Sequence, residues 1–324
     1  SATIAFDDAT GYDFNLTVPM RAADWLYFRI HQRGNLLYDS TFLNPTICFE
    51  TLVPVPRYTI TNLGTLGDIS EARAINDSGQ VAGVWGIPAP GQENLGSPFL
   101  WEVGVMTDLC QKLVCCQHGR ADAINILGHV VGTANFGGAA THAFLWKNGC
   151  PVDIGVPVGS HDSYALGINS VGEIVGVARD DRQPPDSPQI PIFWQGGRLI
   201  ELSLTAGGAN GQARDINDAG TVVGWLKALD GSYRAVMWSI RFIPEGLEPS
   251  DLGNLGGSSL ALAINSTNQV VGWSYLAGGA HHAFFFRDRR MLDLGTLGGL
   301  SSEAYDLNDD DQVIGFAETV GGRV

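Results

Sequence analysis

The chain has 324 residues, 42 of them glycine, with a charged fraction of 16% and a formal net charge of −15. The charged fraction is below the usual value of about a quarter, so the composition favours apolar strands joined by turns. Net negative charge without a Lys/Arg-rich run argues against sequence-independent binding to nucleic acid or an anionic membrane, and no apolar run approaches the roughly 18 residues of a membrane span.

Residues 1–45 precede the repeats described below and form a strand-rich N-terminal arm. Within the arm, two apolar stretches of 24–42 flank Gln32-Arg-Gly-Asn35, which predicts a β-hairpin. The hairpin carries six large apolar side chains: Trp25, Tyr27, Phe28, Leu36, Leu37 and Tyr38. These side chains need to be buried against the main body or against another molecule. The arm is therefore a candidate for assembly with copies of the same chain by strand addition.

From residue 58 onward, a ten-residue motif recurs six times, most plainly as Ala263-Ile-Asn-Ser-Thr-Asn-Gln-Val-Val-Gly272. An apolar pair, a polar turn that begins with Asn and a β-branched run predict two strands, a and b, joined by a tight hairpin. The turn asparagines lie 49, 44, 48, 48 and 43 positions apart: Asn76, Asn125, Asn169, Asn217, Asn265 and Asn308. This period is typical of a repeat architecture, and we expect each Asn to bond the backbone of its own turn.

Two more strand-like pieces, c and d, follow each hairpin. Piece c is apolar and aromatic, as in His142-Ala-Phe-Leu-Trp146, and piece d is similar to Asp293-Leu-Gly-Thr-Leu-Gly-Gly299. The tryptophans of piece c are expected to pack between neighbouring units: Trp101, Trp146, Trp194 and Trp238. Five complete a-b-c-d units fit the chain, and four short strands per roughly 45 residues is the size of a propeller blade.

A sixth a–b hairpin at 302–316 has no c or d piece after it. Thr46–Phe49 and 62–67 can supply these pieces, because the spacing between them matches the spacing between c and d in a complete unit. Chain ends that share one blade would close a ring and remove its exposed sheet edges.

We therefore predict an all-β fold, a six-bladed β-propeller of four-stranded blades over 46–316, closed by strands from both termini. The closing blade takes c and d from 46–63 and a and b from 302–316, and 317–324 is a C-terminal tail. An open β-solenoid of the same repeats is the alternative.

The three recurring motifs resemble the HAF-type extracellular repeat of microbial secreted and surface proteins. They are His142-Ala-Phe-Leu-Trp146, Asp293-Leu-Gly-Thr-Leu-Gly-Gly299 and Ala74-Ile-Asn-Asp-Ser-Gly-Gln-Val-Ala-Gly83, and the resemblance covers roughly residues 58–316. Only His142 and His282 keep the His that names the repeat, while Arg234 departs from it. The resemblance implies export or display at the cell surface and no established chemistry. A chain that begins at Ser1 without Met fits a lost leader, or equally a trimmed chain.

The five cysteines are Cys48, Cys110, Cys115, Cys116 and Cys150, and none has the CxxC spacing of a zinc site. An exported chain favours disulfides, and we expect Cys110 to pair with Cys115 or Cys116. A metal site of Cys115, Cys116 and His118 is the alternative, although adjacent cysteines rarely point at one ion.

Residues repeated in every unit are most simply structural, so departures from the repeat are the candidates for binding. In a propeller the b–c and d–a loops share one face, where several insertions would gather on a rigid scaffold. The candidate binding residues on this face are His161, Asp162, Arg179, Asp180, Asp181 and Arg182. The alternative is that these loops are neutral and solvated.

Asp306, Asn308 and Asp310 stand at alternate positions, as oxygen ligands do in calcium loops. The loop lacks the central Gly and the final Glu of an EF-hand, so a solvated acidic turn is the simpler interpretation. No other cofactor is expected.

The sequence contains no Gly-x-Ser-x-Gly, HExxH, phosphate loop or dinucleotide fingerprint. We therefore expect an exported, non-enzymatic propeller that acts as a structural or interaction module at the cell surface or in extracellular material. Its expected partners are itself, through residues 1–45, or a surface glycan or protein. The alternatives are a carbohydrate-active or carbohydrate-binding propeller and a calcium-stabilised adhesion propeller.

Overall fold

The computed structural model describes residues 2–6, 14–18, 46–49 and 61–321. Within the last range it leaves out 68, 87–95, 111–115, 117, 139, 181, 183–187, 203, 205–209 and 243–247. The chain divides into two compact units, Ser1–Asn62 and Leu63–Val324.

The first unit contains one three-stranded antiparallel sheet, in the order β2-β1-β3. Its strands are β1 (Ala2–Phe6), β2 (Phe14–Val18) and β3 (Thr46–Phe49). The sequence predicted that Thr46–Phe49 pairs with the C-terminal hairpin, and in the first unit β3 pairs with β1, with Cys48 opposite Thr3. The sequence analysis assigned no strand to Ala2–Phe6, although its Thr, Ile and Phe suit a strand. The predicted hairpin at 24–42, with its six apolar side chains, lies outside the described residues.

The second unit contains five four-stranded antiparallel sheets and a two-stranded sheet in its described residues. The first sheet is formed by β4 (Ser70–Ile75), β5 (Val81–Trp85), β6 (Ser97–Glu102) and β7 (Val105–Asp108). The second is formed by β8 (Gly119–Ile124), β9 (Val130–Asn135), β10 (Thr141–Lys147) and β11 (Cys150–Gly155). The third is formed by β12 (Asp162–Ile168), β13 (Ile174–Arg179), β14 (Ile190–Gln195) and β15 (Arg198–Glu201). The next two are formed by β16 (Gly211–Ile216), β17 (Thr221–Lys227), β18 (Tyr233–Ser239) and β19 (Ser250–Asp251); and by β20 (Gly256–Ile264), β21 (Val270–Leu276), β22 (His281–Arg287) and β23 (Arg290–Gly295). The last sheet pairs β24 (Gly298–Leu307) with β25 (Val313–Thr319), and a short 3₁₀ helix, η1 (Ile240–Phe242), follows β18.

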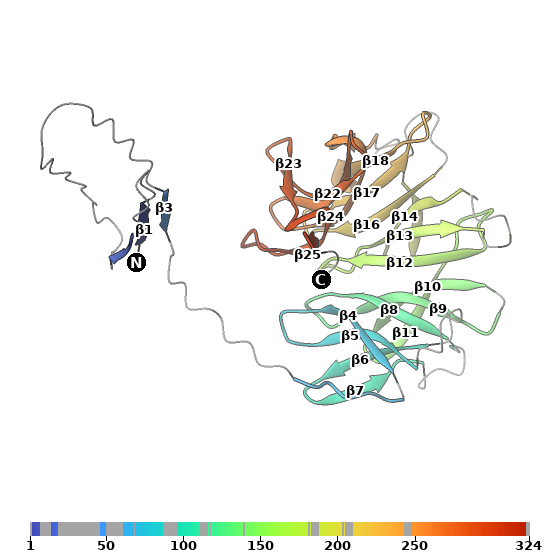
Figure 1. Ribbon diagram of the computed structural model, residues 1–324. Helices are drawn as coiled ribbons and strands as arrows, with labels where there is room; N and C mark the ends of the chain where they lie inside the picture. The colour runs from blue at the N-terminus through green and yellow to red at the C-terminus, as the bar shows by residue number, and fades with distance from the viewer. Residues whose placement is uncertain are drawn as a thin grey trace, which may run out of the picture. The chain divides into compact units, whose positions relative to one another are not determined.

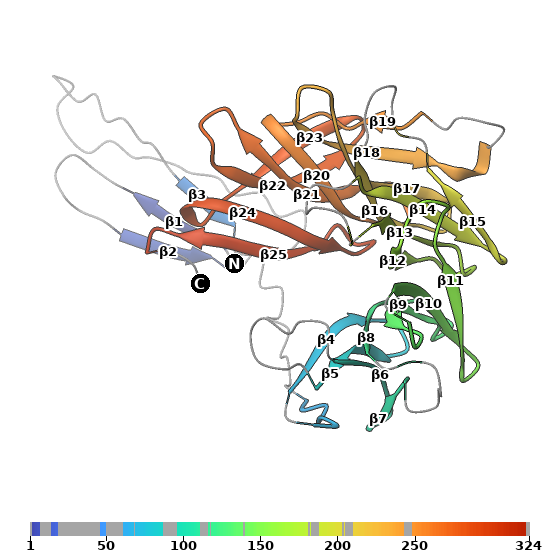
Figure 2. The ribbon, with the colours of Figure 1, turned by 90° about the vertical axis from the view of Figure 1, so that its right-hand side faces the viewer.

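The sheets of the second unit follow one another around an arc (Figures 1 and 2). The first strand of each sheet contacts the first strand of the next, so β4, β8, β12, β16, β20 and β24 lie on the inner side. Apolar clusters fill the spaces between sheets, and Trp238 and Trp194 are buried in two of them, as predicted for the tryptophans of piece c. The five predicted a-b-c-d units are thereby confirmed as all-β, four-stranded antiparallel sheets.

The last sheet differs from the predicted closing blade. Among the described residues, β24 and β25 form a sheet of two strands, and β25 continues to Thr319, past the predicted boundary at 316. The predicted d strand at 62–67 is not a strand. Without a neighbouring c strand, its backbone has no ladder to join.

Every a–b hairpin contains the same irregularity. A β-bulge leaves one residue of the first strand outside the pairing register. The residue just before the bulge is an alanine, and it pairs with a glycine of the second strand. The pairs are Ala72 with Gly83, Ala121 with Gly132, Ala165 with Gly176, Ala213 with Gly224, Ala261 with Gly272 and Ala304 with Gly315. A Cβ atom on any of these glycines would lie 1.9 to 2.1 Å from a backbone carbonyl oxygen of the first strand. The glycine that ends the motif is therefore required by close approach of the two strands.

The turn asparagines hold their own turns, as predicted, and also link neighbouring sheets. Asn125 Oδ1 accepts from the backbone N–H groups of Leu127 and His129, at 3.1 and 3.0 Å. Its Nδ2 donates to the carbonyl of Asn169 in the next sheet, at 2.9 Å. The same bond joins each turn asparagine to the next, from Asn76 to Asn308. This asparagine ladder fixes the spacing of the sheets along their inner ends.

Replacing Asn125 with aspartate tests the ladder. The carboxylate can still accept both N–H groups of its turn, but it cannot donate and would face the Asn169 carbonyl. We expect Asn125→Asp to lower the free energy of unfolding at pH 7 by about 2 kcal/mol, measured by urea denaturation. Asn148→Asp, in an exposed turn, adds the same charge and is expected to change it little. Equal losses in the two variants would mean that the ladder contributes nothing.

Buried serines form a second link between sheets. Ser163 Oγ accepts from the N–H of Ala143 on β10, at 2.9 Å, and donates to the carbonyl of Gly155, at 2.6 Å. Ser259 and Ser302 repeat this arrangement in later sheets. All three serines are buried, so each hydroxyl satisfies polar backbone groups that water does not reach.

Candidate functional site

The residue at each bulge lies on the inner strand of its sheet and is skipped in the register of the strand pairing. We call these six residues the bulge positions: Arg73, Asp122, Leu166, Arg214, Leu262 and Tyr305. Bulges re-aim side chains and are frequent beside functional sites. The flanking alanine, asparagine and glycine are constant, whereas the bulge positions hold basic, acidic, aliphatic and aromatic residues. The variable chemistry of the repeat is thus concentrated at one inner position.

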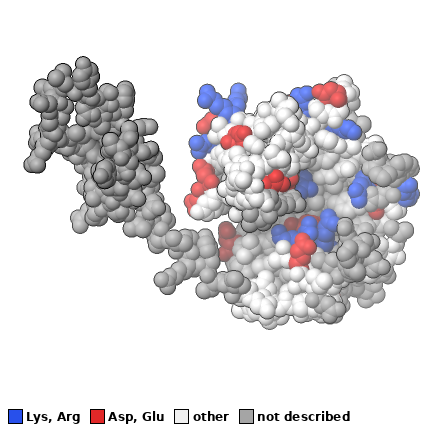
Figure 3. All heavy atoms as spheres, in the orientation of Figure 1, with Lys and Arg blue, Asp and Glu red and all other residues white. Residues whose placement is uncertain are grey.

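Three bulge positions and one neighbour form a central charged cluster, which consists of Arg73, Arg120, Asp122 and Arg214. Asp122 Oδ1 accepts from Nε of Arg120 at 2.9 Å and from Nε of Arg73 at 3.1 Å. The Asp122 side chain is only 7% exposed, and burial raises its pKa although both arginines oppose the shift. Figure 3 shows basic and acidic atoms gathered in a hollow at the middle of this face.

Arg214 approaches the cluster from the fourth sheet. Its Nη1 donates to Gln212 Oε1 on its own strand at 3.4 Å, a weak contact. Burial lowers the pKa of Arg214, and the charge of Asp122 opposes this shift while Arg120 and Arg73 add to it. The charges of Asp122, Arg120 and Arg73 therefore act on Arg214, although β12 lies between β8 and β16 in the order of the sheets.

Asp215, next to Arg214, joins the fourth and fifth sheets. Its two oxygens accept from the backbone N–H groups of Ile216, at 2.8 Å, and Ile264, at 2.9 Å. A Cβ atom on Gly167 would lie 3.0 Å from the Asp215 Cα, so glycine lets β12 approach β16 closely. Burial raises the pKa of Asp215 to about 6, and the two backbone bonds limit the shift.

The raised pKa of Asp215 gives a pH dependence of stability. The folded protein holds the Asp215 proton up to about pH 6, whereas the ordinary pKa is 3.8. Between these values the folded state binds more protons, so this group's contribution to the free energy of unfolding falls as pH rises, by roughly 3 kcal/mol in total. We expect Asp215→Asn to remove this slope in urea titrations from pH 4 to 7. Asp77→Asn, in an exposed turn, should leave it unchanged, and parallel curves for wild type and Asp215→Asn would contradict the assignment.

The predicted binding-face residues fall into two groups. His161 Nδ1 lies 2.8 Å from Asp162 Oδ2, and the His161 N–H donates to the Arg179 carbonyl at 3.0 Å, so these three residues meet at the outer end of β12 and β13. Asp162 is buried and also accepts from the Thr141 N–H. Asp180 and Arg182 form an ion pair with each other at 2.7 Å. Asp181 lies outside the described residues. These contacts are local and do not join the central charged cluster in the described part of the chain.

A disulfide joins Cys110 to Cys116, which confirms the expectation that Cys110 pairs with one of the two neighbouring cysteines. Cys115 lies outside the described residues. Cys48 and Cys150 lie in β3 and β11, and their side chains are not described. The alternative metal site of Cys115, Cys116 and His118 is wrong as proposed, because the sulfur of Cys116 is in the disulfide.

The calcium candidates Asp306, Asn308 and Asp310 lie in a turn that is held by its own hydrogen bonds. Asn308 Oδ1 accepts from the N–H groups of Asp310 and Gln312, and Asp306 Oδ1 accepts from the Leu307 N–H. Burial raises the pKa of Asp306, which opposes the ionised form that calcium requires. In the described residues, no three His, Cys, Asp or Glu side chains are grouped to hold a metal ion.

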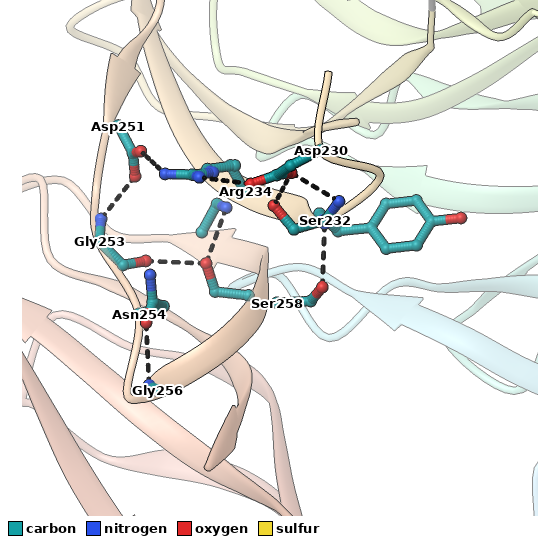
Figure 4. Close-up of polar contacts among 11 residues, drawn as sticks. Asp230, Ser232, Arg234, Asp251, Gly253, Asn254, Gly256 and Ser258 are labelled. Atoms are coloured by element: carbon teal, nitrogen blue, oxygen red, sulfur yellow. Dashed lines mark hydrogen bonds and ion pairs between the residues drawn. The ribbon is translucent and has the colours of Figure 1, made fainter. Parts of the chain in front are cut away.

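The His of the HAF motif has a structural partner. Nδ1 of His142 lies 2.9 Å from Asp153, and His282 stands in the same relation to Asp293. In the fourth sheet Arg234 takes this role, donating to Asp251 at 3.2 Å while Asp251 accepts from the Gly253 N–H (Figure 4). Histidine or arginine at this position therefore holds the acidic residue of the d strand.

The central charged cluster was not predicted from the sequence. Its signal was the position three residues before each turn asparagine, which varies while the alanine before it is the same in all six copies. That position breaks the alternation of apolar and polar residues, because the bulge shifts the register there.

No protein-family model and no curated protein matches the chain. Solved structures with a similar fold include the β-propeller domain of the trilobed protease from Pyrococcus furiosus, with a TM-score of 0.49, 10% identity and coverage of 78% of this chain and 77% of that one. TolB from Acinetobacter baumannii has a TM-score of 0.45 and 13% identity, over 69% of this chain and 53% of that one. The sialidase from Trypanosoma rangeli has a TM-score of 0.46 and 11% identity, over 77% and 52%. This chain thus spans about half the length of TolB and of the sialidase, and identities this low concern the fold alone. Among the described helices, none is long and apolar enough to cross a membrane.

Proposed function

We propose that the chain is an exported, non-enzymatic interaction module built on a closed six-bladed β-propeller, with its binding surface at the bulge positions. The observation that carries the proposal is the six-fold bulge, which places one side chain of variable chemistry at the same point of the inner strand in each sheet. A rigid frame that carries variable side chains at equivalent places is suited to recognition. The Cys110–Cys116 disulfide supports an oxidising setting outside the cell.

The two ends of the asparagine ladder support closure of the ring. At one end, Asn308 Nδ2 donates to Gln312 within its own turn, which leaves its second hydrogen for a further acceptor. At the other end, the Asn76 carbonyl accepts from Gly79 of its own turn and retains a lone pair. A closed ring would join these groups as the other turns are joined. Asn308→Asp should then destabilise the protein as much as Asn125→Asp, and a much smaller loss would mean that the array stays open.

The binding role is tested with a triple variant, Arg73→Leu/Asp122→Leu/Arg214→Leu. Leucine already occupies two bulge positions, Leu166 and Leu262, so the backbone tolerates it there. The probes are arrays of neutral and acidic oligosaccharides and immobilised wild-type protein, which also tests self-association. We expect the triple variant to keep its melting temperature within a few degrees and to lose binding to the probe that wild type retains. Unchanged binding by a folded triple variant would refute a role for the bulge positions.

A carbohydrate-binding role at the hairpin end of β21 and β22, the two central strands of the fifth sheet, is the second candidate. The ring centroid of Trp273 lies 5.4 Å from that of Tyr275 and 5.3 Å from that of His281, and His281 Nε2 lies 3.0 Å from Glu303. Exposed aromatic rings next to a polar pair can stack on a flat ligand and orient it. Tyr275→Ala should then abolish binding to neutral oligosaccharides, and a variant that binds them as wild type does would exclude this site.

A further inference from the structure

Arg214 is a partly buried cation without a carboxylate partner among the described residues. Its single hydrogen bond there is the 3.4 Å contact with Gln212. Both oxygens of the adjacent Asp215 accept backbone N–H groups and are turned toward Ile216 and Ile264. A buried charge is stabilised by pairing and by hydrogen bonds, and Arg214 has little of either from the protein.

The two arginines beside Asp122 also keep unused donors. A guanidinium has five N–H donors. Arg120 uses Nε for Asp122, and Arg73 uses Nε for Asp122 and Nη1 for Glu71, at 2.8 Å. Four terminal nitrogens have no hydrogen-bond acceptor among the described residues. They are Nη1 and Nη2 of Arg120, Nη2 of Arg73 and Nη2 of Arg214. Arg73 and Arg120 thus keep unused N–H groups beside Asp122, and Arg214, at the equivalent bulge position of the fourth sheet, feels the charges of all three residues.

We infer that Arg73, Arg120 and Arg214 form a binding site for a carboxylate group of a ligand. This inference rests on the proposed function and names the ligand class that the bulge positions would take. The planar guanidinium matches a carboxylate in geometry, and Asp122 already shows that Arg73 and Arg120 can hold one between them. The ligand's carboxylate would pair with Arg214 and accept from the terminal nitrogens of the other two arginines.

The inference is tested by calorimetric titration of the full chain with trigalacturonate, its methyl ester and sodium acetate. The ester keeps the sugar rings and removes the charge, and acetate supplies the carboxylate alone. We expect the acid to bind and the ester not to bind. Arg214→Leu should weaken binding of the acid by at least tenfold, as loss of a charge-assisted hydrogen bond does. Arg198→Leu makes the same change of charge at an exposed position of β15 and should bind as wild type does.

Three outcomes would overturn the inference. Equal weakening by Arg198→Leu and Arg214→Leu would mean that net charge, and not this site, attracts the ligand. Equal binding of acid and ester would remove the carboxylate from recognition. If neither the acid nor acetate binds, the site takes no carboxylate. If wild type binds neutral oligosaccharides and the triple variant does not, the proposed function is still supported. Failure of the carboxylate inference can therefore be distinguished from failure of the proposed function. If acetate binds as the acid does per carboxylate, the sugar adds nothing and the ligand need not be a saccharide.

Discussion

Replacing Gly224 with alanine is expected to prevent stable folding of the fourth sheet. An alanine Cβ would lie 1.9 Å from the Gln212 carbonyl oxygen, where contacts under 3.0 Å essentially do not occur. Both atoms belong to backbone in paired strands, so relief requires β16 and β17 to separate and lose the Ala213–Gly224 pairing. We expect a loss of at least about 4 kcal/mol in the free energy of unfolding, seen in urea denaturation or as insoluble protein.

Two further variants make the Gly224 result interpretable. Gly278 has no atom within 4 Å of an added Cβ and no positive φ, so Gly278→Ala should change stability by less than about 0.5 kcal/mol. Gly315→Ala introduces the same clash in the terminal hairpin, 1.9 Å from the Glu303 carbonyl oxygen, and keeps the test measurable if Gly224→Ala yields no soluble protein. Normal stability of both Gly224→Ala and Gly315→Ala would mean that the close approach of the two strands is not required.

Removing the guanidinium of Arg241 is expected to be the second most damaging change. Glu173 is only 1% exposed, and its carboxylate accepts from Arg241 at 2.9 Å, from Asn169 at 2.6 Å and from Gln195 at 2.8 Å. Arg241→Met leaves this buried charge with neutral donors alone. Because the Arg241 side chain is 42% exposed, we expect a loss at the lower end of the usual range, about 3 kcal/mol at pH 7.

A double-mutant cycle isolates this interaction. Glu173 lies four residues after the turn asparagine of the third hairpin, and three of the other hairpins have glutamine at this position. In two of them, Gln80 and Gln312 accept a hydrogen bond from the turn asparagine, so Glu173→Gln should be tolerated. In the Glu173→Gln background, Arg241→Met is expected to cost at least about 1 kcal/mol less than in wild type. The exposed arginine change Arg290→Met serves as the control. An equal cost in both backgrounds would show that the ion pair does not stabilise the fold.

The repeat could be predicted from the sequence because its strands alternate with turn residues at a fixed period. Five a-b-c-d units, the hairpin asparagines and the tryptophans between sheets all follow from this pattern. The asparagine ladder was not predictable in the same way. The same side chain holds its own turn and reaches the next one 43 to 49 residues away, and only the first role is local.

The pairing of Thr46–Phe49 with Ala2–Phe6 and the central charged cluster were not predicted. Thr46–Phe49 has the composition and spacing of a c strand, but strand pairing depends on which partners are available, and Ala2–Phe6 pairs with it. Arg73 and Asp122 looked like ordinary exposed charges because the bulge inverts the alternation that identifies the inner side of a strand. One usable signal was present, since an alanine stands four residues before every turn asparagine and a glycine seven residues after it, although no turn occurs at either place.

The bulge also separates two kinds of selection within one stretch of twelve residues, from the paired alanine to the glycine, as in Ala261 to Gly272. Mutations of the alanine, asparagine or glycine affect folding, whereas mutations at the bulge position affect what the surface binds. Duplication of a repeat would therefore add one new position for adaptation and leave the older ones undisturbed. A library randomised at Arg73, Asp122, Leu166, Arg214, Leu262 and Tyr305 would sample many surfaces on one architecture, as loop libraries do on antibody frameworks.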